Sequence, residues 1–182
     1  TQAVIDMKCY VNYYHKGTFK DQLVYKEQEV NVDLDLAHLK KLNAPIKLKI
    51  EKDGNKYLVT GSYYIPVDAF SSQKEPVKIE KTLASLPASI NTRVGTLSFT
   101  KNGNFKLKDG ESLKAIIVTP DMAASGYAKA LTVSQTSKTT TIAELVLKDE
   151  DPQRSIDYLN TLIKVYNRQA NEDKNEISYR TE

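Results

Sequence analysis

The stretch that follows Asp151-Pro152 constrains the fold more than any other part of the chain. Asp151 can accept hydrogen bonds from the free amides of a first helical turn, and proline is favoured at the first helical position. Apolar residues then recur at alternating spacings of three and four, interrupted by Asp173, which is typical of a helix with one narrow apolar face. These residues, called the apolar stripe below, are Ile156, Leu159, Ile163, Tyr166, Ala170 and Ile177. We therefore predict a long helix that begins at Asp151-Pro152 and needs a partner along the apolar stripe.

The apolar stripe has two interpretations. The helix can pack with this face on the strands of its own domain, which would bury Ile156, Leu159 and Ile163. Its later part, over residues 166–177, can instead extend past the domain and pack on helices of neighbouring copies. We expect the first three residues to be buried, and residues 172–182 to be exposed or disordered because polar side chains dominate there.

The acidic triplet of residues 149–151 also has two interpretations. It could be a metal site or an acid/base pair, but the alternating oxygen ligands and the glycine of a calcium-binding loop are absent. Capping of the helix and the favourable interaction of carboxylates with the helix dipole explain all three residues without a ligand. We therefore predict a helix cap at Asp151 and Pro152, and no metal site.

Between residues 19 and 118 the hydrophobic period changes to two. Apolar and polar residues alternate over residues 30–36 and again over residues 46–51. Such alternation is typical of strands with one buried and one exposed face. Turn sequences at residues 53–55 and 102–104 separate further apolar segments. We predict roughly seven or eight strands in this block, at a spacing typical of a sandwich or barrel.

The two ends of the chain show a different order of patterns. Residues 1–14 are predicted to be the end of a helix, and residues 120–131 a short helix. Strands are predicted at residues 131–135 and 140–147, joined by a polar turn at residues 136–138. This order suggests an α/β unit that is interrupted by an inserted β domain, and one continuous α+β domain is the alternative.

Composition and motifs exclude several classes of function. The net charge of the 182-residue chain is +3 and is evenly spread along the sequence, which argues against nucleic-acid binding. No apolar segment reaches the roughly 20 residues of a membrane span. The sequence has no P-loop, no HExxH or GxSxG motif and no Cys/His cluster, and its single cysteine, Cys9, is expected in the core. No residue is predicted to be catalytic, to hold a metal or to bind a cofactor.

Two groups of residues leave a function related to glycans open. The adjacent Tyr63 and Tyr64 would place one ring on the outer face of a strand. An exposed ring can stack on a sugar, or it can fill the edge of a sandwich with its hydroxyl in water. Asp33 and Asp35 would point to the same side of a strand, either as the carboxylate pair of a glycosidase or as part of a solvated face. We favour the solvated face.

Three segments resemble a known family of proteins. They are LPASINTRVGTLSFT at residues 86–100, TVSQTSKTTTIAELVLKDEDPQRSIDYLNTLIKVYN at residues 132–167 and NEDKNE at residues 171–176. These segments are similar to the extracytoplasmic region of bacterial polysaccharide co-polymerases, the chain-length determinant family, in the type fused to a cytoplasmic tyrosine autokinase. The matching motifs are an apolar strand end at Leu145–Leu147, Asp151-Pro152 with a helix over Ile156–Asn167, Leu86-Pro87, and Thr-x-Val-Gly-x-Leu at Thr92–Leu97.

The resemblance implies a fold and a location. The fold would be α+β, with a split α/β base, a long C-terminal helix and an inserted all-β domain like a jelly-roll sandwich. Residues 1–18 and 119–182 would form the membrane-proximal base, and residues 19–118 the inserted domain. The chain would be the periplasmic part of an inner-membrane protein, with one transmembrane helix before it and one after it. The start at Thr1 and the helical pattern that still continues near Glu182 agree with a piece of a longer protein.

The resemblance also implies a function. Copies of the chain would assemble into a homo-oligomeric ring that regulates polymer length in the biosynthesis of capsular polysaccharide, exopolysaccharide or lipopolysaccharide O-antigen. The polysaccharide polymerase and the growing glycan would be its partners. The kinase motifs of the family are cytoplasmic, so we predict a non-enzymatic scaffold without a cofactor. The alternative is a carbohydrate-binding β module of a cell-surface glycan system, with Tyr63 and Tyr64 in contact with the glycan.

Overall fold

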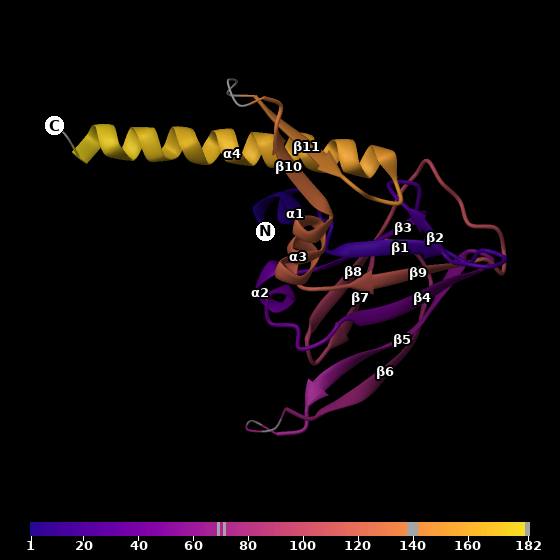
Figure 1. Ribbon diagram of the computed structural model, residues 1–182. Coiled ribbons are helices and arrows are strands. Elements are labelled where there is room, and N and C mark those ends of the chain that lie inside the picture. The colour runs from indigo at the N-terminus through magenta and orange to yellow at the C-terminus, as the bar shows by residue number, and fades with distance from the viewer. Residues whose placement is uncertain (69, 71, 138–141, 181–182) are drawn as a thin grey trace. The chain divides into compact units, whose positions relative to one another are not determined.

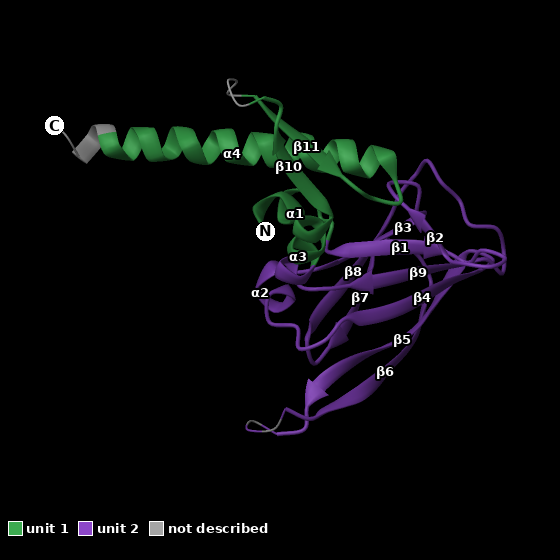
Figure 2. Cartoon of the chain, viewed as in Figure 1, with its two compact units in different colours: residues 1–9, 123–182 green, residues 10–122 purple. Residues whose placement is uncertain are grey.

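The computed structural model of the chain describes residues 1–68, 70, 72–137 and 142–180, with only the backbone for residues 178–180 (Figure 1). The chain divides into two compact units (Figure 2). Unit 1 combines residues 1–9 with residues 123–182, and unit 2 comprises residues 10–122. Both ends of the chain therefore contribute to unit 1.

Unit 2 contains a six-stranded antiparallel sheet. Its strands are β1 (Val11–His15), β2 (Gln22–Val24), β4 (Ile46–Asp53), β5 (Lys56–Pro66), β6 (Lys74–Leu83) and β9 (Ser112–Ile117). They lie in the order β2-β1-β9-β4-β5-β6 (Figure 1). On β4 the alternation of the sequence buries Ile46, Leu48 and Ile50 on one face and leaves Lys47 and Lys49 exposed on the other.

A three-stranded antiparallel sheet completes the core of unit 2. It consists of β3 (Val30–Leu34), β7 (Ala88–Thr92) and β8 (Gly95–Lys101), in the order β3-β8-β7, and the short helix α2 (Leu36–Leu39) follows β3. Leu97 and Phe99 of β8 are completely buried. The Tyr13 hydroxyl of β1 accepts a hydrogen bond from the Val32 amide of β3 at 2.8 Å in the buried interior. The buried faces of the two sheets therefore share one core.

The hairpin predicted around residues 53–55 is confirmed. Asp53 of β4 pairs with Lys56 of β5, which leaves a two-residue loop between the strands. Gly54 in this loop has a φ of 58°, a left-handed conformation that glycine adopts without steric cost.

Unit 1 joins helices to a two-stranded antiparallel sheet. It contains α1 (Gln2–Asp6), most of α3 (Pro120–Ala130), β10 (Leu131–Gln135), β11 (Ala143–Leu147) and α4 (Pro152–Arg180). Helix α1 packs against α4, with Val4 completely buried and an ion pair of 3.3 Å between Asp6 and Arg168. The predicted strand start at Thr140 and Lys138 of the predicted turn lie outside the described residues.

The predicted fold class, with a split α/β base and a jelly-roll-like insert, is wrong. The described residues are mostly β, with 41% strand and 27% helix, and their three sheets are all antiparallel. The ends of the chain form no α/β base, because β10 and β11 are neighbouring antiparallel strands rather than parallel strands joined by a helix. Unit 2 divides its strands six and three between two sheets, unlike the roughly eight strands and two Greek keys of a jelly roll. The structure is α+β in content but does not have the long-helix co-polymerase fold.

The helix predicted over residues 1–14 is also wrong beyond Asp6. Lys8 has a φ of 54°, which is incompatible with a continued right-handed helix. Strand β1 follows, with Val11 and Tyr13 buried on the same face. This short alternation places residues 10–18 in unit 2, whereas the sequence grouped them with the ends of the chain.

Candidate functional site

Helix α4 begins at an acidic segment that fixes its first turn. The Asp151 carboxylate accepts a hydrogen bond from the Arg154 amide at 2.8 Å, and Pro152 is the first helical residue. The Asp149 carboxylate accepts two hydrogen bonds from the Arg154 guanidinium, at 2.6 and 2.5 Å. The part of the chain that the structure describes contains no group of three ligands that could hold a metal ion. Asp149 and Asp151 therefore hold the start of the helix through hydrogen bonds.

Arg154 connects this acidic segment to the aromatic core of unit 1. Its guanidinium carbon lies 5.7 Å from the centre of the Tyr127 ring, within the range of a cation–π contact. The rings of Tyr127 and Tyr158 are stacked, with centroids 4.0 Å apart. Burial by itself would lower the pKa of Arg154, but the hydrogen bonds from its guanidinium to Asp149 raise that pKa overall. The charged Arg154 and the two stacked rings hold in place the face of α4 that packs within unit 1, which we call its inner face.

The single cysteine belongs to the same core. Cys9 is 5% exposed, and burial raises the pKa of its thiol. Because the thiolate is the reactive form, a buried thiol with a raised pKa is a poor nucleophile. Cys9 is therefore a small core residue, as predicted, although it lies in the turn after α1 rather than on a helix.

The apolar stripe lies on a different side of α4 from the buried residues. Tyr158 and Val165 are buried, whereas Ile156 and Ile163 of the stripe are 52% and 46% exposed. The two sets of residues lie roughly a third to a half of a turn apart on the helix. The prediction that Ile156 and Ile163 are buried against the domain's own sheet is wrong, and Leu159 is half-buried. Tyr158 and Val165, on another face of α4, pack against the rest of unit 1 instead.

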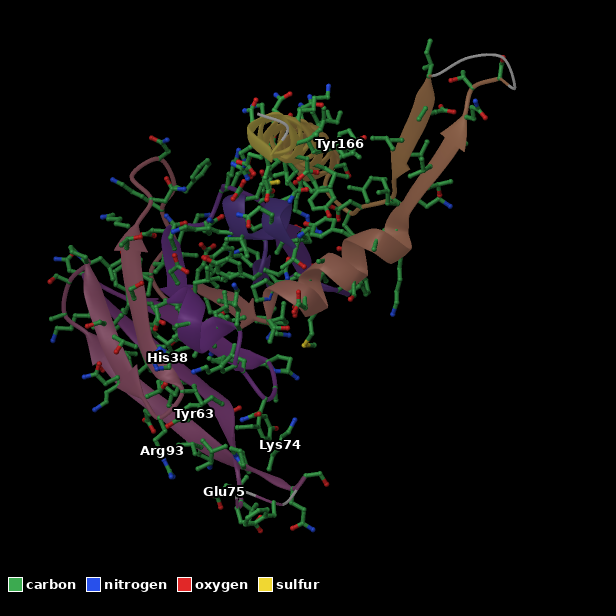
Figure 3. The ribbon with its side chains drawn as sticks, turned by 90° about the vertical axis from the view of Figure 1, so that its left-hand side faces the viewer. His38, Tyr63, Lys74, Glu75, Arg93 and Tyr166 are labelled. Atoms are coloured by element: carbon green, nitrogen blue, oxygen red, sulfur yellow. The ribbon has the colours of Figure 1, made fainter. Side chains whose placement is uncertain are left out.

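The later part of the stripe is exposed as well. Tyr166, labelled in Figure 3, is 70% exposed and Ile177 is 65% exposed, while Ala170 is half-buried. Residues 171–177 are all exposed. The exposure predicted from residue 172 onward is found as far as residue 177, where the described side chains end. Helix α4 thus presents apolar side chains to solvent along most of its length.

The tyrosine pair of β5 is not an exposed platform for a sugar. Tyr63 faces the core of unit 2 with 5% of its surface exposed, and its hydroxyl accepts a hydrogen bond from the Arg93 amide at 3.2 Å (Figure 3). Tyr64 points to the opposite face of the strand and is 36% exposed. A glycan can therefore reach Tyr64 but not Tyr63.

The two aspartates proposed as a glycosidase pair have separate structural roles. Asp33 of β3 accepts a hydrogen bond from the Tyr10 hydroxyl at 2.8 Å. Asp35 lies beyond the strand and caps α2, where it accepts a hydrogen bond from the His38 amide at 3.1 Å. This hydrogen bond and the contact of 2.6 Å between the Asp35 carboxylate and the His38 ring lower the pKa of Asp35. The two carboxylates therefore do not lie together on one strand as the sequence suggested, and each has its own hydrogen-bond partner.

Sequence reasoning missed a buried polar cluster around Glu29 in unit 2. The Glu29 side chain is fully buried and accepts hydrogen bonds from the Lys52 ammonium at 2.7 Å and the Tyr57 hydroxyl at 2.5 Å. The Leu107 amide also donates to this carboxylate. Burial raises the pKa of Tyr57, and the hydrogen bond to Glu29 raises it further, to about 12. No sequence motif indicates the cluster, because its members are far apart in the chain.

Comparison with known proteins adds no family assignment. No protein-family model matches the chain, and no curated protein sequence is significantly similar to it. In the described part of the chain, no helix combines the length and the apolar composition that crossing a membrane requires. The exposed apolar stripe of α4 is the feature of the described residues that bears most directly on function.

Proposed function

We propose that the chain is a non-catalytic, self-associating scaffold in the periplasmic part of a membrane-anchored chain-length determinant. It acts in the biosynthesis of capsular polysaccharide, exopolysaccharide or O-antigen, beside the polymerase and the growing glycan. Assembly of several copies regulates the length of the polymer. The segments at residues 86–100 and 132–176 support the choice of process through their resemblance to that family. The fold gives no such support, since it differs from the fold that the resemblance implies.

The exposed apolar stripe is the observation that carries the proposal. Ile156, Ile163, Tyr166 and Ile177 expose between 46% and 70% of their surface along one helix. Exposed apolar residues that gather on one surface typically mark an interaction site. Apolar residues at alternating spacings of three and four suit a partner helix, and a second copy of α4 supplies one.

The inner face of α4 leaves the stripe free for a partner. Tyr158 and Val165 on that face pack within unit 1, and Arg168 pairs with Asp6. Association through the stripe therefore needs no rearrangement of these contacts. A helix with two differently oriented apolar faces can belong to its own unit and to an assembly at the same time.

A polar residue interrupts the stripe and favours a defined assembly. Asp173 stands between Ala170 and Ile177, where the spacing of the stripe calls for an apolar residue, and it is exposed. A single polar residue in such a series lowers the stability of helix pairing but selects register and partner number. A scaffold with a fixed number of copies requires that kind of selection.

The proposal is tested by polymer length in the organism that encodes the protein. We expect Ile163→Asp to change the length distribution of the surface polysaccharide on electrophoretic gels, because it places a charge in the stripe. Asn160→Asp is the matched control, since Asn160 is exposed on α4 outside the stripe. Immunoblots must show equal protein levels for both variants. An unchanged distribution with Ile163→Asp, or the same change with Asn160→Asp, would contradict the proposed function.

A further inference from the structure

The outward face of the six-stranded sheet carries a groove with concentrated positive charge. The groove has a volume of about 710 Å³ and lies over β1, β9, β4 and β5 of unit 2. Its charged side chains are Lys16, Lys47, Lys49, Lys114, Asp21 and Glu51. We call it the lysine groove. Its four positive and two negative side chains give the groove a net charge of +2, and the whole chain has a net charge of +3. Positive charge that is evenly spread along the sequence is therefore concentrated at one place in the folded unit.

The strand register places two lysines directly opposite each other. Lys49 of β4 is the cross-strand neighbour of Lys114 of β9. Like charges at such positions destabilise a sheet. Glu51 lies 2.8 Å from Lys49 and Asp21 lies 3.3 Å from Lys114, which offsets part of this repulsion. The stability of the sheet does not explain the lysine pair, whereas an anionic ligand over it would.

Two further lysines of the groove are available to a ligand. Lys16 and Lys47 are exposed, and neither forms an ion pair with any residue in the ranges 1–68, 70, 72–137 and 142–180. Lys47 lies two residues before Lys49 on the same face of β4. The groove therefore offers positive charge beyond what its own carboxylates neutralise.

The remaining lining of the groove suits a sugar chain. Tyr14, Lys114, Lys49 and Thr60 are consecutive cross-strand neighbours, so an aromatic ring, two ammonium groups and a hydroxyl share one row across the sheet. An aromatic ring can stack on a sugar ring, and the hydroxyl can exchange hydrogen bonds with those of the sugar. Nucleic acid is a poorer match, because the described residues that line the groove include no arginine and a single aromatic residue.

We infer that the lysine groove binds an acidic polysaccharide whose sugars carry carboxylate groups. The ammonium groups of Lys47, Lys49 and Lys114 pair with the carboxylates, and the Tyr14 ring contacts the face of a sugar. This inference rests on the proposed function, which supplies a polysaccharide as the partner. It assigns the glycan contact to the outer sheet face rather than to Tyr63.

Titration calorimetry of the 182-residue chain with polygalacturonate oligosaccharides tests the inference. We expect binding that weakens as salt is added, because charge pairs supply much of the attraction. Lys47→Glu should weaken binding roughly tenfold, since it replaces an attraction with a repulsion at an exposed position that need not alter the fold. Lys101→Glu, on β8 of the other sheet, is the matched charge reversal and should leave the affinity unchanged.

Several outcomes would overturn the inference. They are no measurable binding, equal weakening by both charge reversals, equal binding of neutral dextran, and tighter binding of single-stranded DNA than of polygalacturonate. The polymer-length experiment on α4 has a separate outcome. If Ile163→Asp alters polymer length but the chain does not bind polygalacturonate, the inference about the lysine groove fails and the proposed function stands. If the chain binds polygalacturonate but Ile163→Asp leaves polymer length unaltered, the proposed function fails and binding at the lysine groove stands.

Discussion

The Glu29 carboxylate connects segments of unit 2 that are distant in the sequence. It accepts hydrogen bonds from Lys52, Tyr57 and the Leu107 amide, and the residue itself lies directly before β3. Burial alone would raise the pKa of this carboxyl, but the hydrogen bonds and the charge of Lys52 hold it below its ordinary value of 4.5. Removing one partner of a buried charge pair is strongly destabilising, because the other charge remains buried without compensation.

Glu29→Gln should lower the free energy of unfolding by about 3 kcal/mol near neutral pH. The pKa of Glu29 is lower in the folded than in the unfolded state, so its stabilising contribution is present above pH 4.5 and is lost as the pH falls through the folded pKa. The difference between wild type and variant should therefore shrink on acidification. Urea unfolding of both proteins at several pH values measures this difference in the free energy of unfolding.

The exposed Glu27 supplies the control for this prediction. Glu27→Gln should change the free energy of unfolding by less than about 0.5 kcal/mol at any pH. A Glu29→Gln effect that is equally large in acid and at neutral pH would show that the charge of Glu29 does not provide the stability.

Individual site residues were hard to predict because their partners are distant in the sequence. Lys52 is 23 residues from Glu29, and Leu107 is 78 residues away. Hydrophobic patterns report on neighbours within a few positions and contain no information on such contacts. The same limit applies to the lysine groove, which forms only when β4 and β9 become neighbours.

Helix α4 and most strands could be predicted because their signals are local. Asp151-Pro152 marks the start of α4, and alternating residues mark β3 and β4. The short β1 was missed, since the adjacent Tyr13 and Tyr14 obscure its alternation. The stripe of α4 could be identified from spacing, but spacing alone does not tell which side of a helix meets its own unit.

Tyr158→Ala should destabilise unit 1 much more than Tyr166→Ala. Tyr158 is 5% exposed and stacked on Tyr127, so its truncation leaves a cavity and should cost about 3 kcal/mol. Tyr166 lies on the same helix but is 70% exposed, and its truncation should change stability by less than about 0.5 kcal/mol. Urea unfolding followed by circular dichroism compares the two variants. Equal effects would contradict the assignment of the inner and outer faces of α4.

At the scale of the whole molecule, strand pairing between distant residues decided the fold. Val11 near the start of the chain is paired with Ile117. Local segments that resemble a co-polymerase can therefore occur in a chain whose strand order differs from the one that the resemblance implies. The resemblance predicted elements such as α4 better than it predicted architecture, because architecture depends on pairings that no local segment contains.

The mass, in detergent, of the membrane-anchored protein that we propose tests the central claim most directly. Native mass spectrometry or light scattering should compare wild type with Ile163→Asp and Asn160→Asp. We predict a discrete higher oligomer for wild type and Asn160→Asp, and smaller species for Ile163→Asp, because its charge interrupts the apolar stripe of α4. A wild-type protein that stays monomeric over a wide concentration range, or an Ile163→Asp variant as large as wild type, would contradict assembly through α4.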